Sequence, residues 1–129
     1  MSQPYAVFLF NRTRNMALPW AEAGVLCYLV DIQHPPGETP DPVHPNIIYV
    51  GADARHWFPP QSIRPIFVAC NPPCTDISVS GARWFPSKGL RRLAQAIELV
   101  AVAKEFCEWA GCPFLIENPV SVISSYWRK

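Results

Sequence analysis

The first indication of the fold is the segment Pro65-Ile66-Phe67-Val68-Ala69-Cys70, followed at once by Asn71-Pro72-Pro73-Cys74. Its first six residues are apolar, and β-branched and aromatic side chains among them are typical of a short buried strand. The strand must end at the two prolines, because neither has a backbone N–H to donate to a sheet. Cys74 then follows the carboxyl end of a strand, where open α/β sheets bind ligands. It is a candidate nucleophile, or else a buried structural cysteine behind a proline corner.

Apolar runs elsewhere predict the rest of the sheet. Strands are expected at 5–10, 25–30, 47–50 and 113–116. A short helix is expected at 16–23, ended by Gly24, and a proline-rich loop at 35–45. Residues 54–62 are expected to form an irregular helix or turn, and 75–89 a long loop over the site. The alternation of strands and helices favours an α/β domain with a mostly parallel sheet.

The clearest helix is predicted from Leu90 to Ala110, with Gly111 as its end. Apolar residues recur there at steps of three or four and form one stripe. The stripe consists of Leu93, Ile97, Val100, Ala103, Cys107 and Ala110.

Length and composition indicate one small domain with a real core. The chain has 129 residues, half of them hydrophobic, and a formal net charge of +1. That charge excludes a general affinity for polyanions, so any contact with nucleic acid must come from a local patch. No apolar run approaches the roughly 20 residues of a membrane span, and no signal peptide is recognised at the start. We therefore expect a cytoplasmic protein.

The five cysteines are expected to be reduced thiols in that compartment. A structural zinc site is the alternative. Against it, the spacings Cys70-x3-Cys74 and Cys107-x4-Cys112 contain no tight C-x2-C pair. The three histidines are scattered through the expected loops, at His34, His44 and His56. They are interpreted as side chains that are exposed or that make their hydrogen bonds within the protein.

Polar residues follow most of the predicted strands. Parallel strands joined by right-handed crossovers bring their carboxyl ends to one edge, and that edge is expected to collect Asn11, Asp31, Asp53, Cys74 and Glu117. There Asp31 and Asp53 can accept hydrogen bonds from a ribose and an adenine amino group. Cys74 can add to an electrophilic carbon while Glu117 handles a proton on the same substrate.

Two motifs carry a resemblance to a known family. Asn71-Pro72-Pro73-Cys74, with Glu117-Asn118-Pro119 some forty residues later, resembles the DNA cytosine-5 methyltransferases. The segments 75–85 (TDISVSGARWF) and 117–129 (ENPVSVISSYWRK) are most similar to phage- and prophage-borne members. The resemblance implies a Rossmann-like S-adenosylmethionine-dependent methyltransferase fold, incomplete at its C-terminus, so that 1–129 is one partial catalytic domain. It also implies a bacterial or phage-encoded protein.

The same resemblance implies a mechanism. A cytosine is flipped out of double-stranded DNA, the Cys74 thiolate attacks C6, and Glu117 contacts N3 and the amino group. C5 then takes the methyl group of S-adenosylmethionine, and Cys74 is eliminated. The implied cofactor-binding residues are Phe10, Asn11, Thr13, Asp31, Asp53, Asn71 and Pro72.

A basic segment is the predicted contact with DNA. Arg83, Lys88, Arg91 and Arg92 lie there with no acid between 81 and 92, and Trp84 and Phe85 are interleaved. Under the resemblance these residues and Ser78 bind the DNA near the flipped base. The alternative is a solvated helix start, although cations are electrostatically unfavourable at a helix N-terminus.

The chain departs from the family in three ways. The family's first loop follows a pattern like F-x-G-x-G, whereas 10–15 contains no glycine, so Arg12 and Arg14 are expected to crowd the methionine end of the cofactor. Family members usually continue much further, which suggests a truncated product, a remnant, or half of an enzyme completed by a second polypeptide. Thr75 follows the nucleophile where Gln is usual.

Two other functions stay open. Amino-methyltransferases acting on adenine N6 or cytosine N4 use a similar Asn-Pro-Pro motif, but with an aromatic residue at the place of Cys74. The second alternative is an inactive methyltransferase-like fragment that binds DNA or a protein. The loop without glycine and the short chain both favour it.

Overall fold

The structure, a computed structural model, describes residues 3–11, 13–71 and 90–116, and for 90–93, 95 and 96 it describes the backbone alone. Within these residues the elements are two α-helices, a 3₁₀ helix and six strands. In chain order they are β1 (Tyr5–Leu9), α1 (Leu18–Glu22), β2 (Leu26–Val30), β3 (Gly37–Pro40), β4 (Ile47–Gly51), the 3₁₀ helix η1 (Ala54–His56), β5 (Phe67–Cys70), α4 (Leu90–Ala110) and β6 (Phe114–Ile116).

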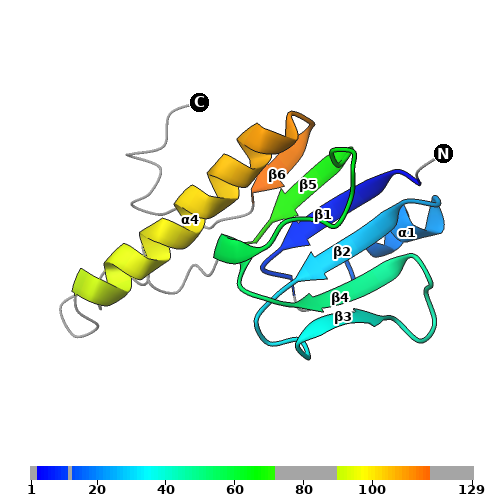
Figure 1. The fold of residues 1–129 in the computed structure, drawn as a ribbon, viewed down its shortest axis with the longest axis horizontal. Helices are drawn as coiled ribbons and strands as arrows, with labels where there is room; N and C mark the ends of the chain where they lie inside the picture. The colour runs from blue at the N-terminus through cyan, green and yellow to red at the C-terminus, as the bar shows by residue number, and fades with distance from the viewer. Residues whose placement is uncertain (1–2, 12, 72–89, 117–129) are drawn as a thin grey trace.

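These strands form one sheet in the order β3-β4-β2-β1-β5-β6, and only β3 runs antiparallel to its neighbour (Figure 1). The predicted α/β architecture with a mostly parallel sheet is confirmed, and it is compatible with a Rossmann-like fold. The chain moves outward from β1 in one direction to β2 and β4, and later in the other direction to β5 and β6. This reversal on the two sides of β1 is the kind of switch point where open α/β sheets bind ligands.

The prediction of a loop at 35–45 is wrong over β3. Residues Gly37–Pro40 pair with β4 in antiparallel register, with Pro40 opposite Ile48. All four side chains are exposed, so the segment has no apolar alternation by which a strand is recognised. Proline is tolerated there because β3 pairs on one side only, which leaves its other edge without a ladder to maintain.

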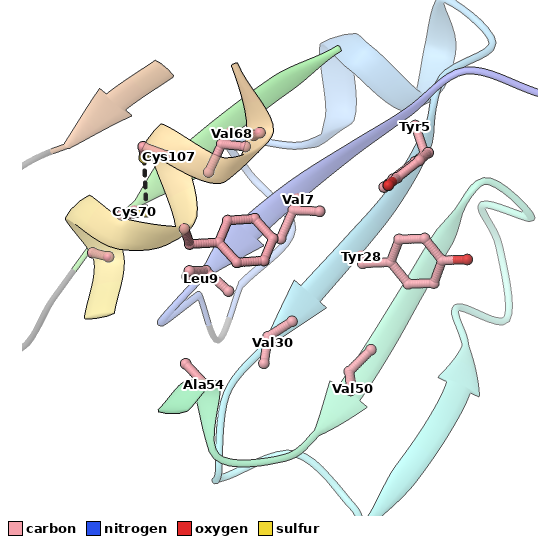
Figure 2. Close-up of a cluster of buried hydrophobic side chains, with 13 residues drawn as sticks. Tyr5, Val7, Leu9, Tyr28, Val30, Val50, Ala54, Val68, Cys70 and Cys107 are labelled. Atoms are coloured by element: carbon pink, nitrogen blue, oxygen red, sulfur yellow. Dashed lines mark hydrogen bonds between the residues drawn. The ribbon is translucent and has the colours of Figure 1, made fainter. Parts of the chain in front are cut away.

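Both faces of the sheet are buried along its central strands β1, β2 and β5, as their unbroken apolar runs predict. On one face Tyr5, Val7 and Leu9 of β1 lie with side chains of β2, β4 and β5 against α4 (Figure 2). On the other face Ala6 and Phe8 pack with neighbouring strands against Ala17 and Ala21 around α1. The sheet is thus the middle layer of the described structure.

Helix α4 has the predicted bounds and ends before Gly111, whose φ of 63° is left-handed. Val100, Ala103, Cys107 and Ala110 of the predicted stripe are buried. Ile97 is not: it is 39% exposed, because the first half of the helix extends past the ends of β1 and β5 (Figure 1). None of the described helices has the length and hydropathy to cross a membrane.

Candidate functional site

A pocket of about 640 Å³ opens at the carboxyl edge of the sheet. That volume suits a small molecule, since ligand pockets usually measure about 300–1,000 Å³. Its walls come from the segments that follow β1, β2, β4 and β5, and from α4. The lining residues are Phe10, Asn11, Thr13, Val30, Asp31, Ile32, Gln33, Ala52, Asp53, Ala54, Arg55, Asn71 and Leu99.

Most of the residues expected to bind a cofactor meet in this pocket. Six of them line it, namely Phe10, Asn11, Thr13, Asp31, Asp53 and Asn71. They come from four strand ends that are distant in the chain and adjacent in the sheet. The seventh, Pro72, lies outside the described residues. What the six residues bind stays a prediction.

The chain turns abruptly where it leaves β1. Phe10 has a φ of 61°, the left-handed region that costs a residue with a side chain about 1–2 kcal/mol. The turn lets the backbone N–H groups of Phe10 and Asn11 both donate to the carbonyl of Val30, at 2.8 and 3.3 Å. A strained residue at the wall of a pocket is a common sign of function.

Asn11 lines the pocket, and one polar atom of its side chain has no partner among the described residues. The residue is 6% exposed, and its amide Nδ2 donates to the carbonyl of Leu9 at 3.3 Å. Its Oδ1 accepts no hydrogen bond from any described residue, although a buried acceptor normally has a partner. The backbone carbonyl of Asn11, in contrast, accepts from Nε2 of His34 at 2.8 Å. The free amide oxygen is therefore an acceptor available to a ligand.

The two acids of the pocket differ in their partners. Oδ1 of Asp31 accepts the backbone N–H of Gln33 at 2.8 Å, and its other oxygen receives no hydrogen bond from the described residues. Both oxygens of Asp53 are engaged by Arg55, which lowers the pKa of that carboxyl below its ordinary value. Asp31 is thus the acid with an oxygen free for a ligand hydroxyl.

Ile32 stands next to Asp31 at the rim of the pocket and is 73% exposed. A large aliphatic side chain left in water beside a free carboxylate oxygen is suited to cover the flat face of a heterocycle. Burying it there would gain about 25 cal/mol per Å² of apolar surface. The lining therefore combines hydrogen-bond acceptors with apolar surface, as small-molecule sites usually do.

Arg14 forms an ion pair with Asp41, and the expectation that it crowds the cofactor stays a prediction. Its Nη1 donates to both carboxylate oxygens of Asp41, at 3.0 and 2.8 Å, and Arg14 does not line the pocket. Asp41 is buried and also accepts from the hydroxyl of Tyr49, at 2.5 Å. This ion pair holds the first loop against the β3–β4 hairpin. Arg12 lies outside the described residues.

The proposed nucleophile and its partner acid, Cys74 and Glu117, lie outside the described residues, as do Ser78, Arg83 and Lys88. Arg91 and Arg92 fall in the first turn of α4, and their side chains are not described. The strands that lead to the two catalytic candidates are parallel neighbours, and Cys70 pairs with Ile116 in register. The carboxyl ends of β5 and β6 therefore lie side by side.

Four described cysteines are free thiols, as expected. Cys70 and Cys107 lie between β5 and α4 with their sulfur atoms 3.8 Å apart (Figure 2). The hydrogen bond with Cys107 and burial raise the pKa of the Cys70 thiol. Among the described residues, no three His, Cys, Asp or Glu side chains gather as they would around a metal ion.

Ile32, Arg55 and Leu99 are among the lining residues that sequence reasoning missed. Ile32 follows a strand-end acid, a position that could have been noticed. Arg55 and Leu99 reach the pocket through the packing of α4 against η1, which local patterns do not reveal.

Comparison with known proteins adds no assignment, since no protein-family model, curated protein or solved structure matches this chain.

Proposed function

We propose that this chain is a catalytic part of a DNA methyltransferase that methylates C5 of cytosine with S-adenosylmethionine as cofactor. The observation that carries the proposal is the pocket at the carboxyl edge, with six of the seven residues expected to hold the cofactor in its wall. The paired motifs around Cys74 and Glu117 supply the choice of reaction.

The lining residues fit an adenosyl group. The free oxygen of Asp31 accepts from ribose hydroxyls, and the unpaired Oδ1 of Asn11 accepts from a further donor of the ligand. Ile32 covers one face of the adenine and loses its exposure to water. The cofactor supplies an electrophilic methyl group, while the chain's part is to hold it and to exclude water.

The geometry at β5 and β6 is compatible with a joint action of Cys74 and Glu117. Cys74 follows Cys70 by four residues, and an extended chain reaches about 3.5 Å per residue. Glu117 follows Ile116 directly, and the strands start these segments about 5 Å apart. Sulfur and carboxylate can therefore reach one pyrimidine ring. The Cys74 thiol needs activation there, because a free thiol with a pKa of about 8.5 is mostly protonated at neutral pH.

Titration calorimetry with S-adenosylmethionine tests the part of the proposal that concerns cofactor binding. Removing the charge of Asp31 in an Asp31→Asn variant should weaken binding about ten- to hundredfold, since hydrogen bonds to a charged acceptor contribute about 1.5–3 kcal/mol. Glu38→Gln removes an exposed acid from β3, outside the pocket, and should bind like the wild type. If the wild type does not bind S-adenosylmethionine at millimolar concentration, the inactive methyltransferase-like fragment is the one function left among those considered.

A covalent trap tests the reaction. Duplex DNA containing 5-fluorocytosine should become bonded to Cys74 when the cofactor is present, because the fluorine blocks the elimination that frees the thiolate. A Cys74→Ser variant should form no adduct. Methylation of an amino nitrogen by wild type and variant alike would instead establish the amino-methyltransferase.

A further inference from the structure

The two acids of the pocket differ in how many hydrogen bonds their oxygens already accept, and the reason is Arg55. Of the described residues that line the pocket, Arg55 alone has a basic side chain. Its Nε lies 3.1 and 3.0 Å from the two oxygens of Asp53, its Nη2 lies 2.6 Å from Oδ2, and its backbone N–H donates to Oδ1 at 2.9 Å. A ligand that sought Asp53 would have to displace four hydrogen bonds.

The same guanidinium reaches across to the long helix. Nη1 of Arg55 donates to Oε1 of Glu98 at 3.2 Å, so one side chain joins the end of β4 to α4. The guanidinium is charged at any ordinary pH, and the hydrogen bonds to Asp53 and Glu98 raise the pKa of Arg55 further. The planar fork of arginine can bond two carboxylates at once, which the single ammonium of lysine does less well.

The connection meets α4 where the helix leaves the core. Val100 is buried, whereas Ala94 and Ile97 are exposed, and the first half of the helix extends past the sheet edge (Figure 1). Leu99, adjacent to Glu98, lines the pocket. The position of that pocket wall therefore depends on how the extending half of α4 is held.

We propose that Asp53, Arg55 and Glu98 form a strap that positions the first half of α4 over the cofactor pocket, with Arg55 as the positioning residue. Asp53 then acts through Arg55, and Asp31 is the acid that contacts the ligand. The proposal deepens the proposed function and rests on it for the identity of the ligand.

Hydrogen–deuterium exchange of the amides in 94–101 tests the strap without any ligand. Glu98→Gln keeps the size of the side chain and removes its charge, so exchange there should rise roughly two- to fivefold, as expected for the loss of an exposed ion pair. Glu105→Gln removes an exposed acid later on the same helix and is the matched control. Exchange at the wild-type rate in Glu98→Gln would overturn the proposal.

Calorimetry with S-adenosylmethionine tests the positioning role. Arg55→Gln and Glu98→Gln should each weaken binding roughly two- to fivefold, and the double variant no more than Arg55→Gln alone, because both break the same connection. One molar salt should abolish the difference from wild type. Independent, additive losses would overturn the proposal.

The acids distinguish the two proposals. Asp53→Asn should resemble Arg55→Gln and lose much less affinity than Asp31→Asn. An equal, large loss in both acid variants would show that Asp53 contacts the ligand, and the strap would be wrong. If the wild type binds no S-adenosylmethionine, the proposed function fails, and the exchange rates of Glu98→Gln alone decide the strap.

Discussion

Asp41 is expected to be the most stabilising charged group of the described structure. Its side chain is 2% exposed and accepts from Tyr49 at 2.5 Å, from the backbone N–H groups of Val43 and His44 at 2.9 and 3.0 Å, and from Arg14. These donors come from the first loop, β4 and the turn after β3. Removing the charge therefore weakens the attachment of three segments at once.

The substitution Asp41→Asn should lower the free energy of unfolding at pH 7 by about 3 kcal/mol. A hydrogen bond to a charged acceptor contributes about 1.5–3 kcal/mol, and asparagine keeps only one of the two acceptor oxygens. Urea unfolding followed by tryptophan fluorescence measures the difference. Glu38→Gln on β3 removes an exposed charge nearby and should stay within about 0.5 kcal/mol of wild type.

The pH dependence gives the sharper test. The hydrogen bond from Tyr49 lowers the pKa of Asp41 in the folded protein. The folded state therefore binds fewer protons than the unfolded state, and this contribution is fully present above the unfolded pKa of about 3.9. It disappears as the pH falls through that value toward the folded pKa. The gap between wild type and Asp41→Asn should therefore narrow below about pH 4. A gap under 1 kcal/mol at pH 7, or one that does not change with pH, would refute this reasoning.

Three further outcomes are expected. Gly51→Ala should destabilise the protein by about 1–3 kcal/mol in urea unfolding, because a Cβ there would lie 2.0 Å from the carbonyl oxygen of Pro35; wild-type stability would contradict that packing. Phe8→Ala should cost about 3–5 kcal/mol by the same measurement, since Phe8 is fully buried, and a loss below 1 kcal/mol would place it outside the core. Cys27, whose pKa burial raises to about 12, should resist iodoacetamide at pH 8 in the native protein and react in urea, as mapped by mass spectrometry; native labelling would contradict its burial.

The sequence predicted the sheet well because burial on both faces leaves a local signature. β1, β2, β4 and β5 are apolar runs, and the ends of α4 are marked by composition and by Gly111. Topology then predicted which strand-end residues share an edge, so Asn11, Asp31 and Asp53 could be placed together before any coordinates. The sequence did not predict β3, because its four residues are exposed and an exposed strand needs no apolar pattern.

Local sequence was enough to predict the central strands, the long helix and the edge at which polar residues collect, because each depends on neighbours in the chain. How charges pair across the fold could be learned only from the three-dimensional arrangement. Arg14 meets Asp41 from 27 positions away, and Arg55 meets Glu98 from 43. Any acid can pair with any base in sequence, and only the packing of loops and helix against the sheet brings particular partners within hydrogen-bond distance. In the described part of the chain, that packing leaves one oxygen of Asp31 without a hydrogen bond, whereas both oxygens of Asp53 accept from Arg55.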